Sequence, residues 1–227
     1  MRAKALVLGA VLFFCTVTGF TGCGNPDIVG NNLVMQAREE YSGLDSARVV
    51  MTNVDTGKEE KVFTFMYSGD TLVYSDWKLV DGRENSEYND GEINAYHHGD
   101  KFYEYKDGDK NFKKYTRSDK HQMTSEDMIT YIPSAITDAK MTVNGDEREL
   151  THVYDVKKVN PSAPEEGEVT DFAVRYVFDK DGKLKYFTET TIYKVDGKEK
   201  RCGYKTVIQD KNNIKEVKNI AGGKEYN

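Results

Sequence analysis

The chain has 227 residues and a formal net charge of −6 at pH 7, with 31% charged and 38% hydrophobic residues. This length suits one globular domain or two small ones. The acidic balance, with lysines and acidic residues mixed along the chain, argues against a nucleic-acid-binding protein and against docking on anionic lipid through a basic patch.

The first 23 residues have the features of an export leader that ends in a cysteine. Arg2 and Lys4 form a short positive segment, and residues 5–17 are an uncharged, mostly apolar run of signal-peptide length. The run is shorter than the about 20 apolar residues of a transmembrane helix. The next block, Phe20-Thr21-Gly22-Cys23, resembles the bacterial lipobox, with Phe20 in place of the usual leucine.

The lipobox resemblance implies cleavage before Cys23 and a diacylglycerol group on its sulfur. A plain secretory leader with an incidental cysteine is the alternative. We therefore expect a signal peptide over residues 1–22, a lipidated tether over 23–30 and one β-rich domain over 31–227. Two acyl chains anchor a protein stably, so the domain is expected on the extracytoplasmic face of the cell membrane. Loss of the two leader cations takes the net charge from −6 to −8.

The three cysteines leave no pair for an internal disulfide. Cys15 lies in the apolar run and Cys23 is the expected lipidation site, so Cys202 remains alone. We interpret Cys202 as a half-buried strand residue, with a reactive thiol as the alternative. An exported chain without disulfides favours a Gram-positive envelope over an oxidising periplasm.

An amphipathic helix is predicted directly after the tether. Its apolar residues recur at helical spacing: Leu33, Val34, Ala37, Tyr41 and Leu44. Asn31 or Asn32 is expected as the N-cap, and Gly43 stands near the end.

From Ser46 the hydrophobic period changes to two, which predicts antiparallel hairpins. The expected strands in this part are 46–53, 61–67, 72–80, 92–97, 102–105 and 112–116. The glycines between them have the spacing of hairpin turns: Gly57, Gly69, Gly82, Gly91, Gly99 and Gly108.

A second helical stretch is predicted over residues 128–139, with Thr124 and Asp127 as a candidate capping box. Pro133 requires either a kink or two short helices that meet there. Asn144-Gly145 then predicts a hairpin turn. The remaining expected strands are 150–159, 169–178, 184–195 and 200–209, with a loop over 160–168 and a final edge at 214–220.

Two short motifs match catalytic signatures without the rest of their sites. Asp55-Thr56-Gly57 matches the aspartic-protease triplet, but it has no second copy and stands where a turn is needed. Ser75 and Lys78 match the S-x-x-K motif of serine acyl-enzymes, but the partner motifs are absent. The two residues would also face opposite sides of a strand.

Metal-site candidates fail in the same way. The segment 107–111 begins like a calcium loop, but Phe112 and Ser118 stand where an EF-hand has Gly and Glu. His97 and His98 would face opposite sides of a strand, and the other histidines, His121 and His152, are isolated in sequence. We therefore expect no metal, no cofactor and no enzymatic activity.

Apolar side chains alternate along several of the expected strands and share sheet faces. These are Phe63, Phe65, Tyr67, Leu72, Tyr74, Phe172, Val174, Tyr176 and Phe178. One interpretation is a dry core beneath the two helices. The other is a pocket that binds an apolar ligand.

The order of these elements resembles the LolA-like superfamily, which includes the outer-membrane lipoprotein carriers and the mycobacterial LprG and LppX lipoproteins. The resemblance covers roughly residues 31–220. It implies an α+β, mainly β fold in which an N-terminal helix and a central helical insertion cover a curved antiparallel sheet, an incomplete barrel. In that family the sheet and helices enclose a cavity for acyl chains, and no catalytic residues are needed.

The leading hypothesis is a non-catalytic lipoprotein that binds or carries a lipid or other apolar ligand on the concave sheet face. The alternative is a cavity-free surface module whose tyrosine-rich strands bind a protein or glycan partner. No nucleic-acid partner is expected under either hypothesis, and both leave the oligomeric state open.

Overall fold

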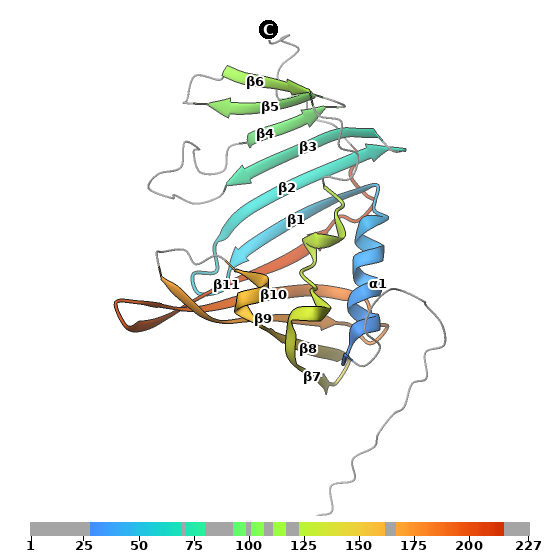
Figure 1. The fold of residues 1–227 in the computed structure, drawn as a ribbon. Helices are drawn as coiled ribbons and strands as arrows, with labels where there is room; N and C mark the ends of the chain where they lie inside the picture. Colours follow the sequence, from blue (N-terminus) through green and yellow to red (C-terminus); the bar gives the residue numbers. More distant parts are fainter. Residues whose placement is uncertain are drawn as a thin grey trace, which may run out of the picture.

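The computed structural model describes residues 28–69, 71–79, 93–98, 101–106, 111–116, 123–161 and 167–215. Within this part of the chain, eleven strands form one antiparallel sheet with the order β6-β5-β4-β3-β2-β1-β11-β10-β9-β8-β7 (Figure 1). The leader and Cys23 lie outside the described residues.

The sheet consists of two meanders. The first contains β1 (Ser46–Asn53), β2 (Glu59–Ser68), β3 (Thr71–Leu79), β4 (Ile93–His98), β5 (Lys101–Lys106) and β6 (Asn111–Thr116). The second contains β7 (Ile136–Asn144), β8 (Glu147–Tyr154), β9 (Glu168–Phe178), β10 (Leu184–Val195) and β11 (Lys198–Gln209). The sheet is open, because β6 and β7 are its two edges.

The two meanders meet where β1 pairs with β11. Arg48 is paired with Gln209 and Asn53 with Tyr204. The Arg48 guanidinium also donates a 2.8 Å hydrogen bond to Oε1 of Gln209, across 161 positions of sequence. This seam places the β1–β2 hairpin beside the β10–β11 hairpin in the middle of the sheet.

One face of the curved sheet is covered by α1 (Asn31–Ser42) and by residues 123–135, which we call the strap (Figure 1). The strap contains two 3-10 turns, η1 (Glu126–Met128) and η2 (Pro133–Ala135). A single helical turn, α2 (Val156–Val159), follows β8. No helix in the described part of the chain is long and apolar enough to cross a membrane.

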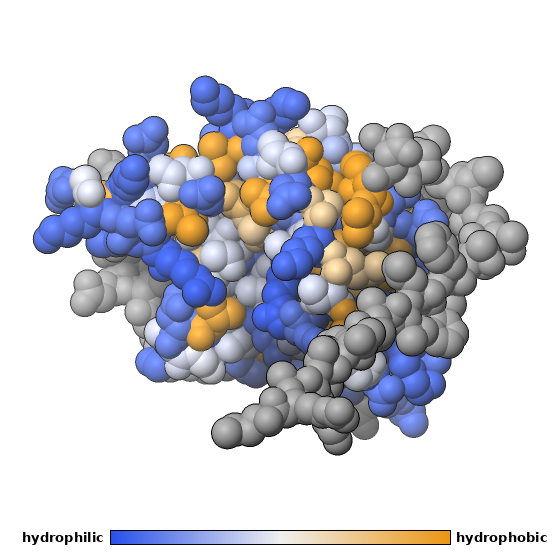
Figure 2. Space-filling view, turned by 90° about the horizontal axis from the view of Figure 1, so that it is seen from below, coloured by the Kyte–Doolittle hydropathy of each residue, from blue (hydrophilic) through white to orange (hydrophobic). Residues whose placement is uncertain are grey.

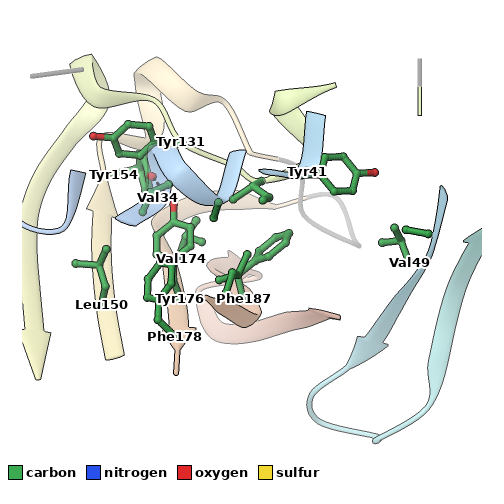
Figure 3. Close-up of a cluster of buried hydrophobic side chains, with 14 of the residues drawn as sticks. Val34, Tyr41, Val49, Tyr131, Leu150, Tyr154, Val174, Tyr176, Phe178 and Phe187 are labelled. Atoms are coloured by element: carbon green, nitrogen blue, oxygen red, sulfur yellow. Dashed lines mark hydrogen bonds between the residues drawn. The ribbon is translucent and has the colours of Figure 1, made fainter. Parts of the chain in front are cut away.

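The apolar core lies between this cover and the sheet (Figure 3). The cover contributes Val34, Ala37, Tyr41, Met123, Ile129, Tyr131 and Ala135. The sheet contributes Ala47, Val49, Phe63, Phe65, Leu150, Tyr154, Phe172, Val174, Tyr176, Phe178, Leu184 and Phe187. Burying this many apolar side chains is the main term that stabilises the cover on the sheet.

The predicted fold class is confirmed: the chain is mainly β, with a curved antiparallel sheet, an N-terminal helix and a central helical insertion. The bounds predicted for β1 and β10 coincide with the observed ones. Asp196 and Gly197 both have positive φ values, 52° and 73°, as a type I′ hairpin turn between β10 and β11 requires.

The helix predicted over residues 128–139 is wrong: residues 129–132 are not helical, and the stretch holds only the end of η1 and the three residues of η2. Residues from Ile136 onward form β7, with Met141 paired with Leu150 of β8. Before the proline, η1 is capped by Ser125, whose hydroxyl accepts the Asp127 N–H at 3.3 Å, and not by Thr124. Pro133 opens η2, where its missing N–H costs nothing.

Three further boundaries differ from the prediction. Gly30, with φ 75°, is the N-cap of α1, where Asn31 or Asn32 was expected, and no side chain caps the helix. The strand expected over 150–159 ends at Tyr154, because Asp155 caps α2 by accepting the Lys157 N–H at 3.0 Å. Ile214 lies outside any strand, and residues 216–220 of the expected final edge lie outside the described residues.

Candidate functional site

Most of the predicted ligand-binding residues form part of the core. Those buried to 6% exposure or less are Phe63, Phe65, Phe172, Val174, Tyr176 and Phe178. Tyr67 is half-buried and packs against the same cluster. Leu72 and Tyr74 belong to β3, but their side chains are outside what the structure describes. Their role in ligand binding stays a prediction.

The buried aromatic rings form two groups along the covered face. Near the C-terminal end of α1, Tyr41 meets Phe65 edge-on with ring centroids 6.1 Å apart. Near the N-terminal end of α1, Tyr176 stacks with Phe178 at 6.3 Å and lies 5.4 Å from the His152 ring. Figure 3 shows Tyr176, Phe178 and Phe187 below α1.

A pocket of about 310 Å³ opens at the C-terminal end of α1. Its lining residues come from α1, from β10 and from the end of β11: Ala37, Glu40, Tyr41, Gly43, Leu44, Leu184, Ile208, Lys211 and Asn212. This volume is at the lower end of the about 300–1,000 Å³ typical of ligand sites. If a methylene occupies about the volume of a liquid water molecule, about 30 Å³, the pocket holds about ten methylenes.

The pocket has an apolar bed and a polar rim. Tyr41 and Leu184 are core residues, and Ile208 packs against the core, so the bed is continuous with it. On the rim, the Glu40 carboxylate accepts hydrogen bonds from Lys183 Nζ and, at 3.0 Å, from Gln36 Nε2. This arrangement suits a ligand with an apolar chain and a polar end.

The rim is also tied to the sheet. Oδ1 of Asn212 accepts the N–H groups of Asp45 at 2.8 Å and Ser46 at 3.3 Å. The N–H of Asn212 donates in turn to the Ser46 carbonyl at 2.7 Å. These bonds fix the segment after β11 against the start of β1, so this side of the pocket is preorganised.

Polar groups of α1 hold the strap in place. The buried Arg38 guanidinium donates to the Ile129 carbonyl at 2.7 Å and to Oδ1 of Asp127 at 3.2 Å. The Tyr41 hydroxyl donates to the Met123 carbonyl at 2.5 Å. Hydrogen bonds from a charged donor are about twice as strong as neutral ones, so Arg38 is the strongest of these contacts.

The N-terminal end of α1 makes a further contact with the strap. The Tyr131 hydroxyl donates to Oδ1 of Asn31 at 2.5 Å. Burial raises the pKa of Tyr131 to about 12. The hydroxyl therefore stays protonated and remains a donor at physiological pH.

Polar groups of the sheet hold the strap from below. The Tyr176 hydroxyl donates to the Thr130 carbonyl, and the Thr130 hydroxyl donates to the Glu189 carboxylate. The single hydroxyl proton of Tyr176 is used on the Thr130 carbonyl. The Tyr154 hydroxyl, 3.1 Å from the Tyr176 hydroxyl, is therefore the donor of the hydrogen bond between the two tyrosines. Burial raises the pKa of Glu189, because desolvation disfavours its ionised form.

His152 joins β8 to the start of α1. Its ring is fully buried, and its Nε2 lies 2.9 Å from the Val29 carbonyl. A carbonyl only accepts, so Nε2 carries the proton; Nδ1 has no hydrogen-bond partner among the described residues. Burial lowers the pKa of His152, and the ring is therefore neutral.

Most of the other sequence candidates lie outside what the structure describes. His121 and residues 107–110 are not among the described residues, and the side chains of Ser75, Lys78, His97 and His98 are not described. Asp55-Thr56-Gly57 lies in the turn between β1 and β2. In the described part of the chain, no group of three or more His, Cys, Asp or Glu side chains is arranged to hold a metal. Cys202 lies on β11, is 7% exposed, and has its thiol pKa raised by burial. A raised pKa disfavours the reactive thiolate.

Sequence reasoning missed the groups that hold the strap. Arg38 follows Val34 by four positions, so a charged residue stands on the apolar face of the helix. Glu189 follows Phe187 by two positions on β10, so both side chains lie on the inward face of the sheet. A charge at an inward position of an amphipathic pattern was the available signal.

Comparison with known proteins gives only distant likenesses. No known protein family and no curated protein matches the chain. Among solved structures, LprF from Mycobacterium bovis is 10% identical, with a TM-score of 0.47, covering 84% of this chain and 96% of that chain. The lipoprotein LppX from Mycobacterium tuberculosis is 13% identical, with a TM-score of 0.46, covering 82% and 97%. At these values the likenesses assign no function.

Proposed function

We propose that this chain is a membrane-anchored, extracytoplasmic lipoprotein with a LolA-like domain that binds a lipid or other apolar ligand without catalysis. The observation that carries the proposal is the pocket at the C-terminal end of α1, whose bed is continuous with the apolar core. An apolar chain placed there would leave water while a polar end stays on the rim.

The pocket size restricts the ligand in the closed structure. A volume of about 310 Å³ accommodates one short acyl chain and not two long ones. A longer chain needs more apolar surface than the pocket offers. No strap residue lines the pocket, but the lining residue Tyr41 holds the strap at the Met123 carbonyl, so displacement of the strap would extend the apolar surface beside Tyr41. The strap is suited to such a movement, because its regular structure is limited to two 3-10 turns of three residues each.

Displacement of the strap would expose the aromatic residues predicted to bind ligand. Tyr176 and Phe172 lie on β9, whose Tyr176 hydroxyl holds the strap at Thr130. An acyl chain that replaces the strap there would find the same apolar surface. In this proposal one apolar surface of the sheet is covered by the strap in the free protein and by the acyl chain in the complex.

The alternative function, a cavity-free module that presents tyrosines to a partner, has less support. Of the eight tyrosines whose side chains the structure describes, five are buried: Tyr41, Tyr131, Tyr154, Tyr176 and Tyr193. Buried rings cannot form a recognition surface, so these five favour a ligand-binding role. The side chains of the tyrosines on β3–β6 lie outside what the structure describes.

The binding test uses full-length protein purified from membranes, with native mass spectrometry for bound lipid and a fluorescent fatty acid as probe. The variant Ile208→Trp fills the pocket, and we expect it to weaken probe binding at least about tenfold, or about 1.4 kcal/mol. The control Gln209→Trp adds the same ring at an exposed position next in sequence and should leave binding unchanged. Absence of bound lipid together with absence of probe binding contradicts the proposal.

The anchor is tested separately with Cys23→Ala. We expect this variant to leave the membrane fraction and to lack the mass of a diacylglycerol group, because both acyl chains of the anchor are attached through Cys23. Unchanged membrane retention contradicts lipidation at Cys23.

A further inference from the structure

Three well-exposed apolar residues stand at the end of the domain where α1 begins. They are Val29 at 42%, Met141 at 42% and Val143 at 65% exposure. We call them the apolar rim. Single exposed apolar residues are normal on a monomer, whereas several that adjoin one another are a candidate interaction surface.

Backbone contacts place the members of the apolar rim close together. The Val29 carbonyl accepts a hydrogen bond from His152, which is paired with Ala139 of β7. Two positions further along β7, Met141 is paired with Leu150. A Cβ placed on Gly30 would lie 2.4 Å from Cδ2 of that leucine, so the chain before α1 runs against β8 beside β7.

The charged residues of β7 lie on the face opposite the apolar rim, because Asp138 and Lys140 alternate with Met141 along the strand. On the face of the rim, the cross-strand neighbour of Val143 is Arg148, whose guanidinium donates to the Lys180 carbonyl at 3.1 Å. Figure 2, which views the molecule from below Figure 1, shows hydrophobic residues scattered among hydrophilic ones. A partner of this surface is therefore bound by apolar contact and not by a field of charge.

The length of the tether restricts what that partner is. Five residue steps separate Cys23 from Ile28, so the two Cα atoms are at most about 18 Å apart. A lipid group on Cys23 would therefore hold the bilayer surface within reach of β7. An edge strand with exposed apolar residues also needs a covering surface.

We propose that the apolar rim settles into the head-group region of the membrane that holds the lipid on Cys23. This inference rests on the lipid anchor of the proposed function. It goes beyond that function because it gives the orientation of the domain relative to the bilayer. The pocket is at the opposite end of α1, a helix of 12 residues that is about 18 Å long. The pocket mouth is thus held off the bilayer, where it meets a partner or a ligand in solution.

The test measures membrane depth at two matched positions. Val143→Cys and Val54→Cys are each made in full-length protein with Cys202→Ala, labelled with a thiol-reactive fluorophore, and bound to phosphatidylcholine vesicles that contain brominated lipid. Both positions are exposed valines, and Val54 follows β1, five strands from β7. We expect the label at 143 to be quenched at least about twofold more, because surface elements settle about 5–10 Å into the interface.

The outcomes separate this inference from the anchor. If protein with Cys23 intact washes off the vesicles, the anchor fails, and the orientation fails with it. If the protein stays bound but the labels at 143 and 54 are quenched equally, the orientation alone is overturned and the lipoprotein proposal stands. The double variant Met141→Ser with Val143→Ser should stay bound to the vesicles through its lipid. A label at position 140 of this variant should lose at least about half of its quenching, because the apolar rim no longer settles about 5–10 Å into the interface.

Discussion

The Arg38 guanidinium of α1 donates a 2.7 Å hydrogen bond to the backbone carbonyl of Ile129, 91 positions further along the chain. Both groups are buried beneath the surface, and the same arginine also pairs with Asp127. The contact fastens the strap to the helix, so the strap cannot leave the sheet unless this hydrogen bond breaks.

Replacing Arg38 tests this fastening. Arg38→Met keeps much of the apolar stem but leaves the Ile129 carbonyl without its donor, and we expect a loss of about 2 kcal/mol in the free energy of unfolding. Urea denaturation measures the loss, and hydrogen exchange should show faster exchange of strap amides. The control Arg48→Met removes a more exposed arginine that pairs with Glu59 at 3.9 Å and should cost less than about 1 kcal/mol. Equal losses in the two variants contradict the role of Arg38.

Replacing Tyr176 tests the attachment of the strap to the sheet. Tyr176→Phe keeps the ring but leaves the Thr130 carbonyl and the Tyr154 hydroxyl without their partner, at a cost of about 1–3 kcal/mol. The control Tyr186→Phe changes a half-buried ring that keeps its contact with Lys205, whose Nζ lies 3.9 Å from the ring centroid. Thermal unfolding of both variants gives the comparison. If Tyr176→Phe proves no less stable than the control, the attachment does not depend on this hydroxyl.

His152 makes the stability of the domain sensitive to acid. Burial lowers its pKa below the ordinary value of 6.5. As the pH falls through 6.5, the unfolded chain takes up a proton that the folded chain does not, so unfolding becomes easier. We expect His152→Gln, whose amide can still donate to the Val29 carbonyl, to lose this part of the pH dependence between pH 7.5 and 5. If the free energy of unfolding of the wild type and of the variant changes with pH in parallel, His152 is not the source of the acid sensitivity.

Glu189 acts in the opposite direction. Burial raises the pKa of Glu189 above the ordinary value of 4.5. Between pH 4.5 and the raised pKa, the folded chain therefore holds a proton that the unfolded chain has lost. The stability that this adds is complete below pH 4.5 and is lost as the pH rises through the raised pKa. We expect Glu189→Gln to be more stable than the wild type at pH 7, with the difference shrinking toward pH 4.5. The exposed control Glu199→Gln should show no such trend in urea denaturation.

The strand pattern was readable from the sequence, because each hairpin is a local structure. The alternation of residues 184–195 and the Asp196-Gly197 turn predict β10 and its end without knowledge of any distant residue. The same holds for β1. In both strands the period of two agrees with burial on one face of a sheet.

The centre of the chain could not be predicted in this way. Met128, Ile129, Ile132 and Ile136 match helical spacing, but the residues after Pro133 find a strand partner in β8. Tertiary pairing overrides a local pattern when both fit the apolar residues. The strap is held by single hydrogen bonds to distant groups, and no spacing rule reports such contacts.

The seam between β1 and β11 has a consequence for how the domain is made. Its paired residues are separated by as many as 161 positions, so the first strand of the sheet waits for the last. Closing such a long loop is slow compared with forming a hairpin. A chain made from its N-terminus can pair β1 with β2 early, but the other edge of β1 stays unpaired until β11 has followed. Completion of the sheet is therefore a late event of biogenesis, in which the two ends of the domain meet.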